Sequence, residues 1–265
     1  MDYVAHFRRE ILAFEAAVRQ AADADEAPLI PSCPGWSVSD LVVHLGGVHR
    51  FLHRLIGERL MTPPDAGDLS TFDLPADLAD WPAPEQAPNR APVAAQLTDW
   101  FAEGARALEE QFVRCGPNEP VWTFGPEQTT GFWPRMQSIE AALHRWDVEN
   151  ALGTAGPIDA ELAVDAVTQT FEVMAPARRS WIPSPPGAGE RFGFRQTDGP
   201  GRWSVHFDGA DVRLTRTPDG PGDVELAGSA SDLTLFLWQR IPADRLTVTG
   251  EQAVLDRYFA LVPPI

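Results

Sequence analysis

The sequence predicts an α+β protein in which an N-terminal four-helix bundle precedes a small α+β domain. Two observations support this fold class. Apolar residues recur at spacings of three and four in four long stretches of the first 153 residues, as in amphipathic helices. After about residue 157, short alternating segments separated by Gly, Pro and Asp replace the long helical patterns. We therefore expect a bundle over residues 1–156 and a second domain over residues 157–265.

The helices of the bundle are also indicated by signals at their starts. Ser37 and Asp40 form a capping pattern before the second helix, and Pro134 suits the first turn of the fourth. The expected helices cover residues 2–24, 37–59, 91–115 and 134–153. Residues 61–90 contain six prolines and little periodicity, which predicts either a lid or a disordered insert. Residues 116–133 form another loop.

The second domain is expected to combine helices with short antiparallel strands. Its apolar stretches and alternating runs are bounded by turn residues, including the link over residues 181–189. Helices are predicted over residues 158–177, 231–239 and 251–262. Strands are predicted over residues 191–196, 202–207, 212–217, 224–227 and 246–248.

Composition excludes several classes of partner. The chain has 21 basic residues, all Arg, and 38 acidic residues, so its formal net charge is −17. Such a charge disfavours binding to nucleic acid or to an anionic membrane surface. No stretch has the roughly 18 apolar residues of a membrane helix, and the N-terminus does not resemble a signal peptide. We expect a cytoplasmic protein, in which Cys33 and Cys115 stay reduced.

Three residues are predicted to form a metal site. Glu140 and His144 lie one turn apart on the fourth helix, so both can reach one cation. His44 lies at the edge of the apolar stripe of the second helix and can complete the set. Two imidazoles and one carboxylate with an open fourth position are a common arrangement for catalytic zinc. Asp147, three residues after His144, is a candidate partner of that histidine or a substitute ligand.

The other histidines of the second helix are predicted to face elsewhere. At 100° per residue, His49 and His53 lie roughly 140–180° from His44. They are interpreted as part of a solvated face, although their spacing could also form a rival metal site. Spacing alone also allows Glu140 and His144 to be an exposed helical pair, and His44 to be a hydrogen-bonded core histidine. The residues thus indicate a possible three-ligand site but no reaction.

Three segments resemble one enzyme family. CPGWSVSDLVVHLGGVH, which begins at Cys33, is similar to a signature of the mycothiol-dependent maleylpyruvate isomerase family. EAALHRWDVENALG, which begins at Glu140, resembles the fourth-helix motif of that family, and DVELAGSASDLTLFLWQR resembles its C-terminal domain. The resemblance implies a DinB-like N-terminal bundle in which His44, Glu140 and His144 bind Zn²⁺. It also implies mycothiol as a thiol cosubstrate.

The chemistry expected from this resemblance is attack of a metal-activated thiolate on an electrophilic small molecule. The outcome is either thiol S-transfer or cis–trans isomerisation of a maleylpyruvate-type substrate. Arg240, at the end of LFLWQR, is the candidate catalytic residue for an anionic substrate, although a helix C-terminus also favours such a charge without any function. Two alternatives stay open: a metallohydrolase that uses zinc-bound water, and a non-catalytic metal-binding regulator. The expected oligomeric state is a monomer or a homodimer.

Overall fold

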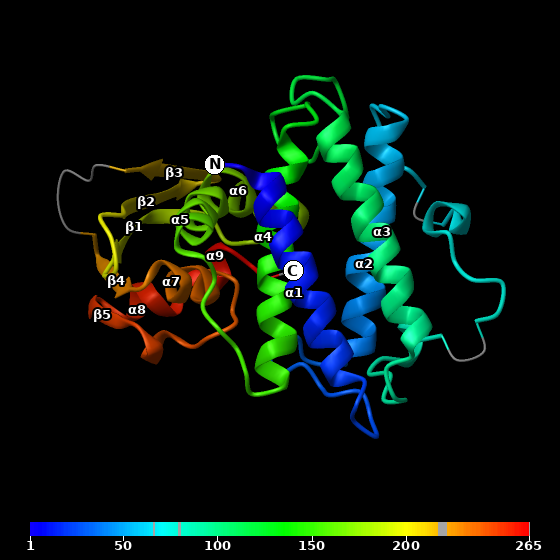
Figure 1. The fold of residues 1–265 in the computed structure, drawn as a ribbon. Coiled ribbons are helices and arrows are strands. Elements are labelled where there is room, and N and C mark those ends of the chain that lie inside the picture. Colours follow the sequence, from blue (N-terminus) through cyan, green and yellow to red (C-terminus); the bar gives the residue numbers. More distant parts are fainter. Residues whose placement is uncertain (66, 79–80, 217–221, 265) are drawn as a thin grey trace. The chain divides into compact units, whose positions relative to one another are not determined.

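The computed structural model describes residues 1–265 except 66, 79–80, 217–221 and 265. The chain divides into two compact units, Met1–Gly156 and Pro157–Ile265 (Figure 1). The first unit is helical and the second contains a small sheet with helices, which confirms the predicted fold class. Among the described residues, no helix is both long enough and apolar enough to span a bilayer.

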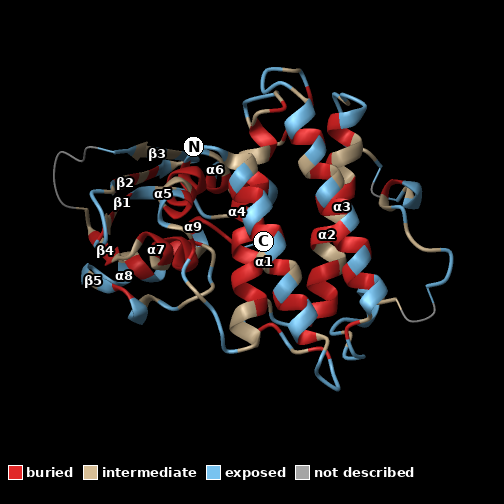
Figure 2. Cartoon of the chain, viewed as in Figure 1, coloured by how far each residue is buried: buried red, intermediate tan, exposed pale blue. Residues whose placement is uncertain are grey.

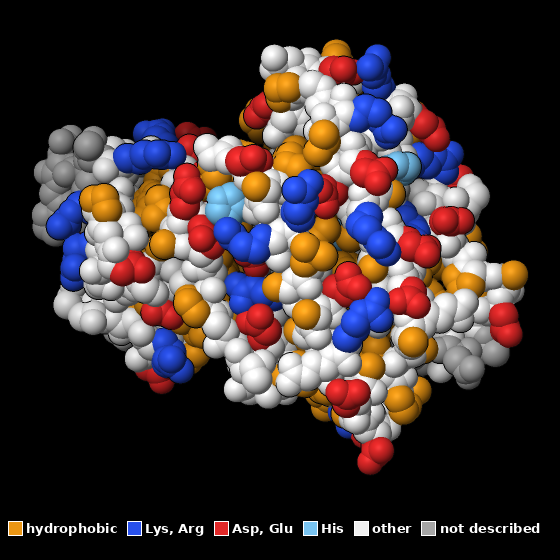
Figure 3. All heavy atoms as spheres, in the orientation of Figure 1, with side chains coloured by type: hydrophobic (Ala, Val, Ile, Leu, Met, Phe, Trp, Pro, Cys, Tyr) orange, Lys and Arg blue, Asp and Glu red, His pale blue; other side chains and the backbone are white. Residues whose placement is uncertain are grey.

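The first unit contains four long helices. They are α1 (Tyr3–Ala21), α2 (Val38–Gly57), α3 (Ala95–Arg114) and α4 (Phe132–Ala151). Helix α1 packs mainly on α4, and α2 packs mainly on α3. Each of the four helices has buried residues along one side and exposed residues along another (Figure 2), because each carries an apolar stripe that needs a partner surface. On the face of this unit that Figure 3 draws, Arg side chains are interspersed with acidic ones.

The start of α2 agrees with the capping pattern in the sequence. The Asp40 amide donates to the Ser37 hydroxyl, and the Asp40 carboxylate accepts from the Ser37 amide at 2.8 Å. This reciprocal pair satisfies two backbone donors that would otherwise have no partner in the first turn. Pro134 is the third residue of α4, where a missing N–H costs nothing. These local signals fix where α2 and α4 begin. They therefore help to set the positions of His44, Glu140 and His144 along the two helices.

The segment between α2 and α3 is anchored to the bundle. It contains two short 3₁₀ turns, Leu69–Phe72 and Pro84–Gln86. Its end is fixed by Asn89, which donates to the Asp40 carboxylate through its backbone amide at 3.0 Å and its side chain at 2.5 Å. Its middle is fixed by the indole N–H of Trp100, which lies 3.1 Å from the Phe72 carbonyl. The described part of this segment therefore forms a wall on the bundle and is not a disordered insert.

The second unit is built on a five-stranded sheet in the order β3-β2-β1-β4-β5. The strands are β1 (Gly187–Gln196), β2 (Arg202–Gly209), β3 (Asp211–Thr215), β4 (Val224–Gly228) and β5 (Thr247–Gly250). The helices are α5 (Ala160–Gln169), α6 (Ala175–Trp181), α7 (Ala230–Leu237), α8 (Gln252–Asp256) and α9 (Tyr258–Leu261). Aromatic side chains of β1 and β2 form its core with Tyr258.

Several predictions for this unit need correction. Strand β4 pairs in parallel with β1, so the sheet is mixed and not purely antiparallel. The helix predicted over residues 158–177 is interrupted by a π-helical turn, Thr170–Met174, before Pro176. Since Pro176 has no N–H to donate, a wider turn accommodates it. The closing helix is split into α8 and α9 at Arg257, and Thr217, the predicted end of β3, lies outside the described residues.

Candidate metal centre and adjoining cavity

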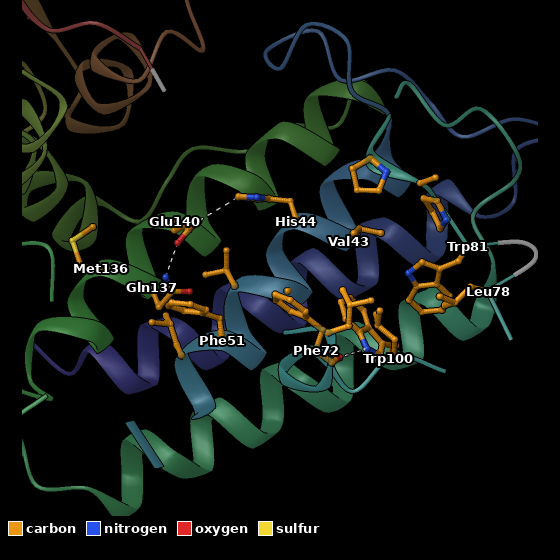
Figure 4. A pocket seen from close by; sticks show the side chains of 18 of the residues that line it. Val43, His44, Phe51, Phe72, Leu78, Trp81, Trp100, Met136, Gln137 and Glu140 are labelled. Atoms are coloured by element: carbon orange, nitrogen blue, oxygen red, sulfur yellow. Dashed lines mark hydrogen bonds and ion pairs between the residues drawn. The ribbon is translucent and has the colours of Figure 1, made fainter. Parts of the chain in front are cut away.

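The three predicted ligands lie together. Nitrogen atoms of His44 and His144 and a carboxylate oxygen of Glu140 are all within 4.8 Å of one another. Nε2 of His44 is 3.5 Å from Oε1 of Glu140 (Figure 4). Helix α2 supplies one donor and α4 supplies two donors one turn apart, so a cation here would have ligands from both helices. This donor set suits Zn²⁺ and leaves a coordination position open.

Hydrogen bonds hold Glu140 in its ionised form. Burial of the side chain opposes ionisation, but the hydrogen bond and charge of His44, together with His144 and Gln137, lower the pKa of Glu140 to about 2. Nε2 of Gln137 donates to Oε2 of Glu140 at 2.5 Å (Figure 4), which leaves Oε1 toward His44. Glu140 therefore offers a negatively charged oxygen to a cation at neutral pH.

His144 is oriented by a buried carboxylate. Its Nδ1 lies 2.9 Å from Oδ2 of Asp147, which is completely buried. The other carboxylate oxygen accepts a 2.6 Å hydrogen bond from the Ser32 hydroxyl, and the Cys33 thiol lies 3.6 Å from Oδ2. When Nδ1–H donates to this carboxylate, the lone pair of Nε2 is available to a metal. The sequence indicated Asp147 as a partner of His144, but it gave no signal for Ser32, which comes from the loop before α2.

The structure corrects the interpretation of His49. This side chain is fully buried between Phe7 of α1 and Phe101 of α3, with ring centroids 5.3 and 5.4 Å away, and is not part of a solvated face. Burial lowers its pKa to about 3, so it is neutral at pH 7. The reason is that α2 is packed on both sides, so its buried arc extends past His49. His53 is half-buried, and of the described residues only His44, Glu140 and His144 form a candidate metal cluster.

A cavity of about 850 Å³ adjoins the metal centre. His44, Gln137 and Glu140 contribute to its wall, and most of the remaining lining is apolar (Figure 4). The aromatic members are Phe51, Phe72, Trp81, Trp100, Trp122, Phe124 and Trp133. The two irregular loops supply Phe72, Trp81, Trp122 and Phe124. This cavity was not predicted from the sequence, although the concentration of aromatic residues in the two loops was a usable signal.

The close packing of α2 on α3 places Trp100 in the cavity wall. A Cβ on Gly46 would lie 2.3 Å from the Trp100 ring, so only glycine allows this approach. The Arg50 guanidinium lies over this ring, 4.2 Å from the ring centroid. Gly104 in turn leaves room for Arg50, since a Cβ there would lie 2.1 Å from Nη1. Two glycines thus allow a tryptophan to sit between the helices.

Arg240 lies in the second unit, three residues after the end of α7. Its Nη1 donates to the backbone carbonyl of Trp238 at 2.8 Å, and its backbone amide donates to the Leu235 carbonyl at 2.7 Å. These contacts are those of a residue at a helix C-terminus. They assign no chemistry to Arg240, whose catalytic role stays a prediction.

Fold and site together define a helical-bundle protein with a candidate metal centre beside a large apolar cavity. The chain belongs to the mycothiol maleylpyruvate isomerase family: the model of the family's N-terminal domain matches residues 7–149, and that of its C-terminal domain matches residues 161–257. The predicted family, and with it the prediction of an enzyme, are confirmed.

Solved structures agree on the fold. A crystal structure of the mycothiol-dependent maleylpyruvate isomerase matches with a TM-score of 0.60 and 15% sequence identity, covering 94% of this chain and 93% of that chain. A structure of a histidine-to-alanine mutant of that isomerase matches with a TM-score of 0.59, at the same identity and coverage. No curated protein sequence matches this chain.

Proposed function

We propose that this chain is a zinc-dependent enzyme that uses mycothiol as its thiol cosubstrate and adds the thiol sulfur to an electrophilic carbon of a small molecule. The observation that carries the proposal is the convergence of His44, Glu140 and His144 beside the cavity. Family membership supports the thiol, because mycothiol is the cosubstrate in the name of the family. The donor set supports zinc.

The residues around the centre would have separate tasks. Zn²⁺, when bound, lowers the pKa of a coordinated thiol so that a thiolate nucleophile exists at neutral pH. Glu140 contributes one negative charge, which reduces the net charge of the centre from +2 to +1. Asp147 holds the proton on Nδ1 of His144 and so keeps Nε2 available as a donor. The cavity holds the electrophile next to His44 and Glu140 and excludes water from it.

The outcome of the reaction depends on the electrophile. If the thiol adds to a conjugated double bond, rotation and loss of the thiol give an isomer and regenerate the cosubstrate. If a leaving group departs, the product keeps the thioether. Both outcomes need the same ligands and the same thiolate. The family name supports isomerisation, and S-transfer is the second outcome of the same chemistry.

Metal analysis and thiol dependence test the proposal. Purified wild-type protein should contain about one zinc per chain and convert an electrophile only when mycothiol is present, consuming the thiol in S-transfer and regenerating it in isomerisation. His44→Ala should lose both properties, whereas His53→Ala, a matched histidine change on the same helix, should retain them. Zinc retained in His44→Ala would contradict the ligand set. Zinc-dependent hydrolysis of an ester in the absence of mycothiol would instead show a metallohydrolase.

Arg240 has a separate test. A role in binding an anionic substrate predicts that Arg240→Gln slows the reaction of a carboxylate-bearing electrophile and leaves that of an uncharged one unchanged. Equal rates for both substrates in the variant and the wild type would remove Arg240 from the site. The cytoplasmic location and the oligomeric state, monomer or homodimer, stay predictions from the sequence.

A further inference from the structure

The charge of the cavity beside the metal centre restricts the substrate. Of the described residues that line it, only Glu85, Glu140 and His44 have ionisable side chains, and none is an Arg. Arg50, although it stacks on Trp100, does not line this cavity but a separate depression with Arg54 and Arg114.

A carboxylate in this cavity would lose its hydration without gaining a partner. Removal of an ionised group from water is costly unless a charge or several hydrogen bonds compensate it. The described wall has no cationic Arg side chain, and Glu85 repels an anion. A zinc centre that held both Glu140 and the thiolate would carry no net charge, so it would not compensate a carboxylate either. Substrates of the maleylpyruvate type carry carboxylates, so this cavity does not suit them.

An uncharged aromatic molecule fits the same walls. Four tryptophans and three phenylalanines line the cavity, and offset or edge-to-face contacts between rings add to the free energy gained from burial. The volume of about 850 Å³ is within the roughly 300–1,000 Å³ range of drug-sized ligand sites. Trp100 and Trp133 are almost fully buried, so these two tryptophans of the cavity wall are held in place by the fold.

We infer that the electrophile bound by this chain is an uncharged aromatic or otherwise apolar molecule, and not a carboxylate. The inference rests on the proposed function for the reaction, but the binding preference it states can be measured without metal or thiol. With a chloronitroarene, the thiolate sulfur forms a bond to the ring carbon that carries chlorine. The carbon–chlorine bond breaks, chloride leaves with the electron pair, and the thiol proton passes to solvent.

Binding of an unreactive pair of ligands tests the inference directly. Methyl 3,5-dinitrobenzoate and 3,5-dinitrobenzoate share a ring and differ in charge, and both quench tryptophan fluorescence. In chelator-treated protein, we expect the ester to bind at least about tenfold more tightly than the carboxylate. Equal affinities, tighter binding of the carboxylate, or binding of neither compound would overturn the inference.

A single charge introduced in the wall should weaken or reverse this preference. Leu78 lines the cavity (Figure 4) and is 43% exposed, so Leu78→Arg can be tolerated by the fold. The variant should bind the carboxylate several-fold more tightly and the ester more weakly. Leu12→Arg adds the same charge at an exposed position of α1 outside the cavity, and it should bind both compounds as the wild type does. The same effect in both variants would show that the ligands bind elsewhere.

A kinetic comparison separates the inference from the proposed function. Methyl 4-chloro-3,5-dinitrobenzoate and the corresponding carboxylate are incubated with zinc-loaded protein and mycothiol, and each rate is divided by its uncatalysed rate. A larger acceleration for the ester supports both conclusions. A larger acceleration for the carboxylate supports the proposed reaction but overturns the substrate class. Ester-selective binding with no zinc-dependent acceleration of either compound overturns the reaction and leaves the binding preference in place.

Discussion

The metal centre and the cavity beside it are built by different means. The centre uses polar side chains from two regular helices, each fixed by hydrogen bonds, such as that of His144 to Asp147. The cavity uses apolar side chains, several of them from irregular loops that are anchored at separate points. One region therefore depends on helical spacing and on buried charges, and the other depends on packing. Substitutions should affect the two regions independently if this division is correct.

The largest effect on stability is expected from the cavity wall. Trp100→Ala removes a buried ring, its contact with Arg50 and the hydrogen bonds of the indole N–H to the Phe72 and Asp73 carbonyls. We expect the free energy of unfolding to fall by about 3–5 kcal/mol in a denaturant titration. Trp100→Phe retains an aromatic ring and should cost less. The folded fraction of Trp100→Ala should still bind metal, and loss of metal from it would show that the two regions are coupled.

Removal of a ligand should have the next largest effect, confined to the metal centre. His144→Ala and Glu140→Gln each remove or weaken one of three donors. We expect the metal affinity of His144→Ala to fall by more than about 100-fold, beyond the range for residues that only orient a ligand. Glu140→Gln, whose amide oxygen is a weaker ligand, should lose at least about tenfold. Competition with a chromophoric chelator measures both values, while the binding of methyl 3,5-dinitrobenzoate should change little.

Asp147→Asn should produce a smaller loss of the same kind. The amide keeps the size of the carboxylate but removes the charge that fixes the proton on Nδ1 of His144. We expect metal affinity to fall by about 10–100-fold, measured by the same competition. Ser32→Ala, which removes one hydrogen bond to Asp147, should lie between this variant and the wild type. An Asp147→Asn protein with wild-type affinity would mean that Asp147 serves packing alone.

Acid should destabilise the bundle through His49. Its pKa is about 3 in the folded protein and about 6.5 when unfolded, so between these values the unfolded chain binds more protons. The contribution of His49 to stability is complete above pH 6.5 and is lost as the pH falls toward 3. Between pH 7 and pH 5 this loss amounts to about 2 kcal/mol. His49→Phe, which fills the same space between Phe7 and Phe101, should show a flatter pH dependence of unfolding over this range.

Helical periodicity explains how much of the site could be predicted. Glu140 and His144 share one face because they are four residues apart, and the capping residues Ser37 and Asp40 fix the start of the helix that carries His44. The same periodicity misplaced His49, because a stripe drawn from Leu, Val and Phe positions does not reveal that α2 is covered by both α1 and α3. The burial of a histidine depends on neighbours distant in the chain.

The cavity could not be predicted from periodicity at all. Its loops have no repeat, and their positions depend on single long-range contacts such as that of Asn89 with Asp40. The parallel pairing of β4 with β1 is hidden for a similar reason, since alternation within a strand does not specify the direction of its neighbour. Signals between residues close in the sequence, such as helical spacing and capping, predicted the helices and the candidate metal ligands. The cavity and the strand order depend on contacts between residues that are far apart in the sequence.

The three candidate ligands come from both helix pairs of the bundle, so a bound cation would link the two pairs. Helices α1 and α4 form one closely packed pair and α2 and α3 form another, and the donors come from both: His44 from the second pair, Glu140 and His144 from the first. A cation held by all three ties the pairs together at a point where few other contacts join α2 to α4. Removal of the cation would take away this link, so metal loss should lower the free energy of unfolding of the bundle as well as its activity.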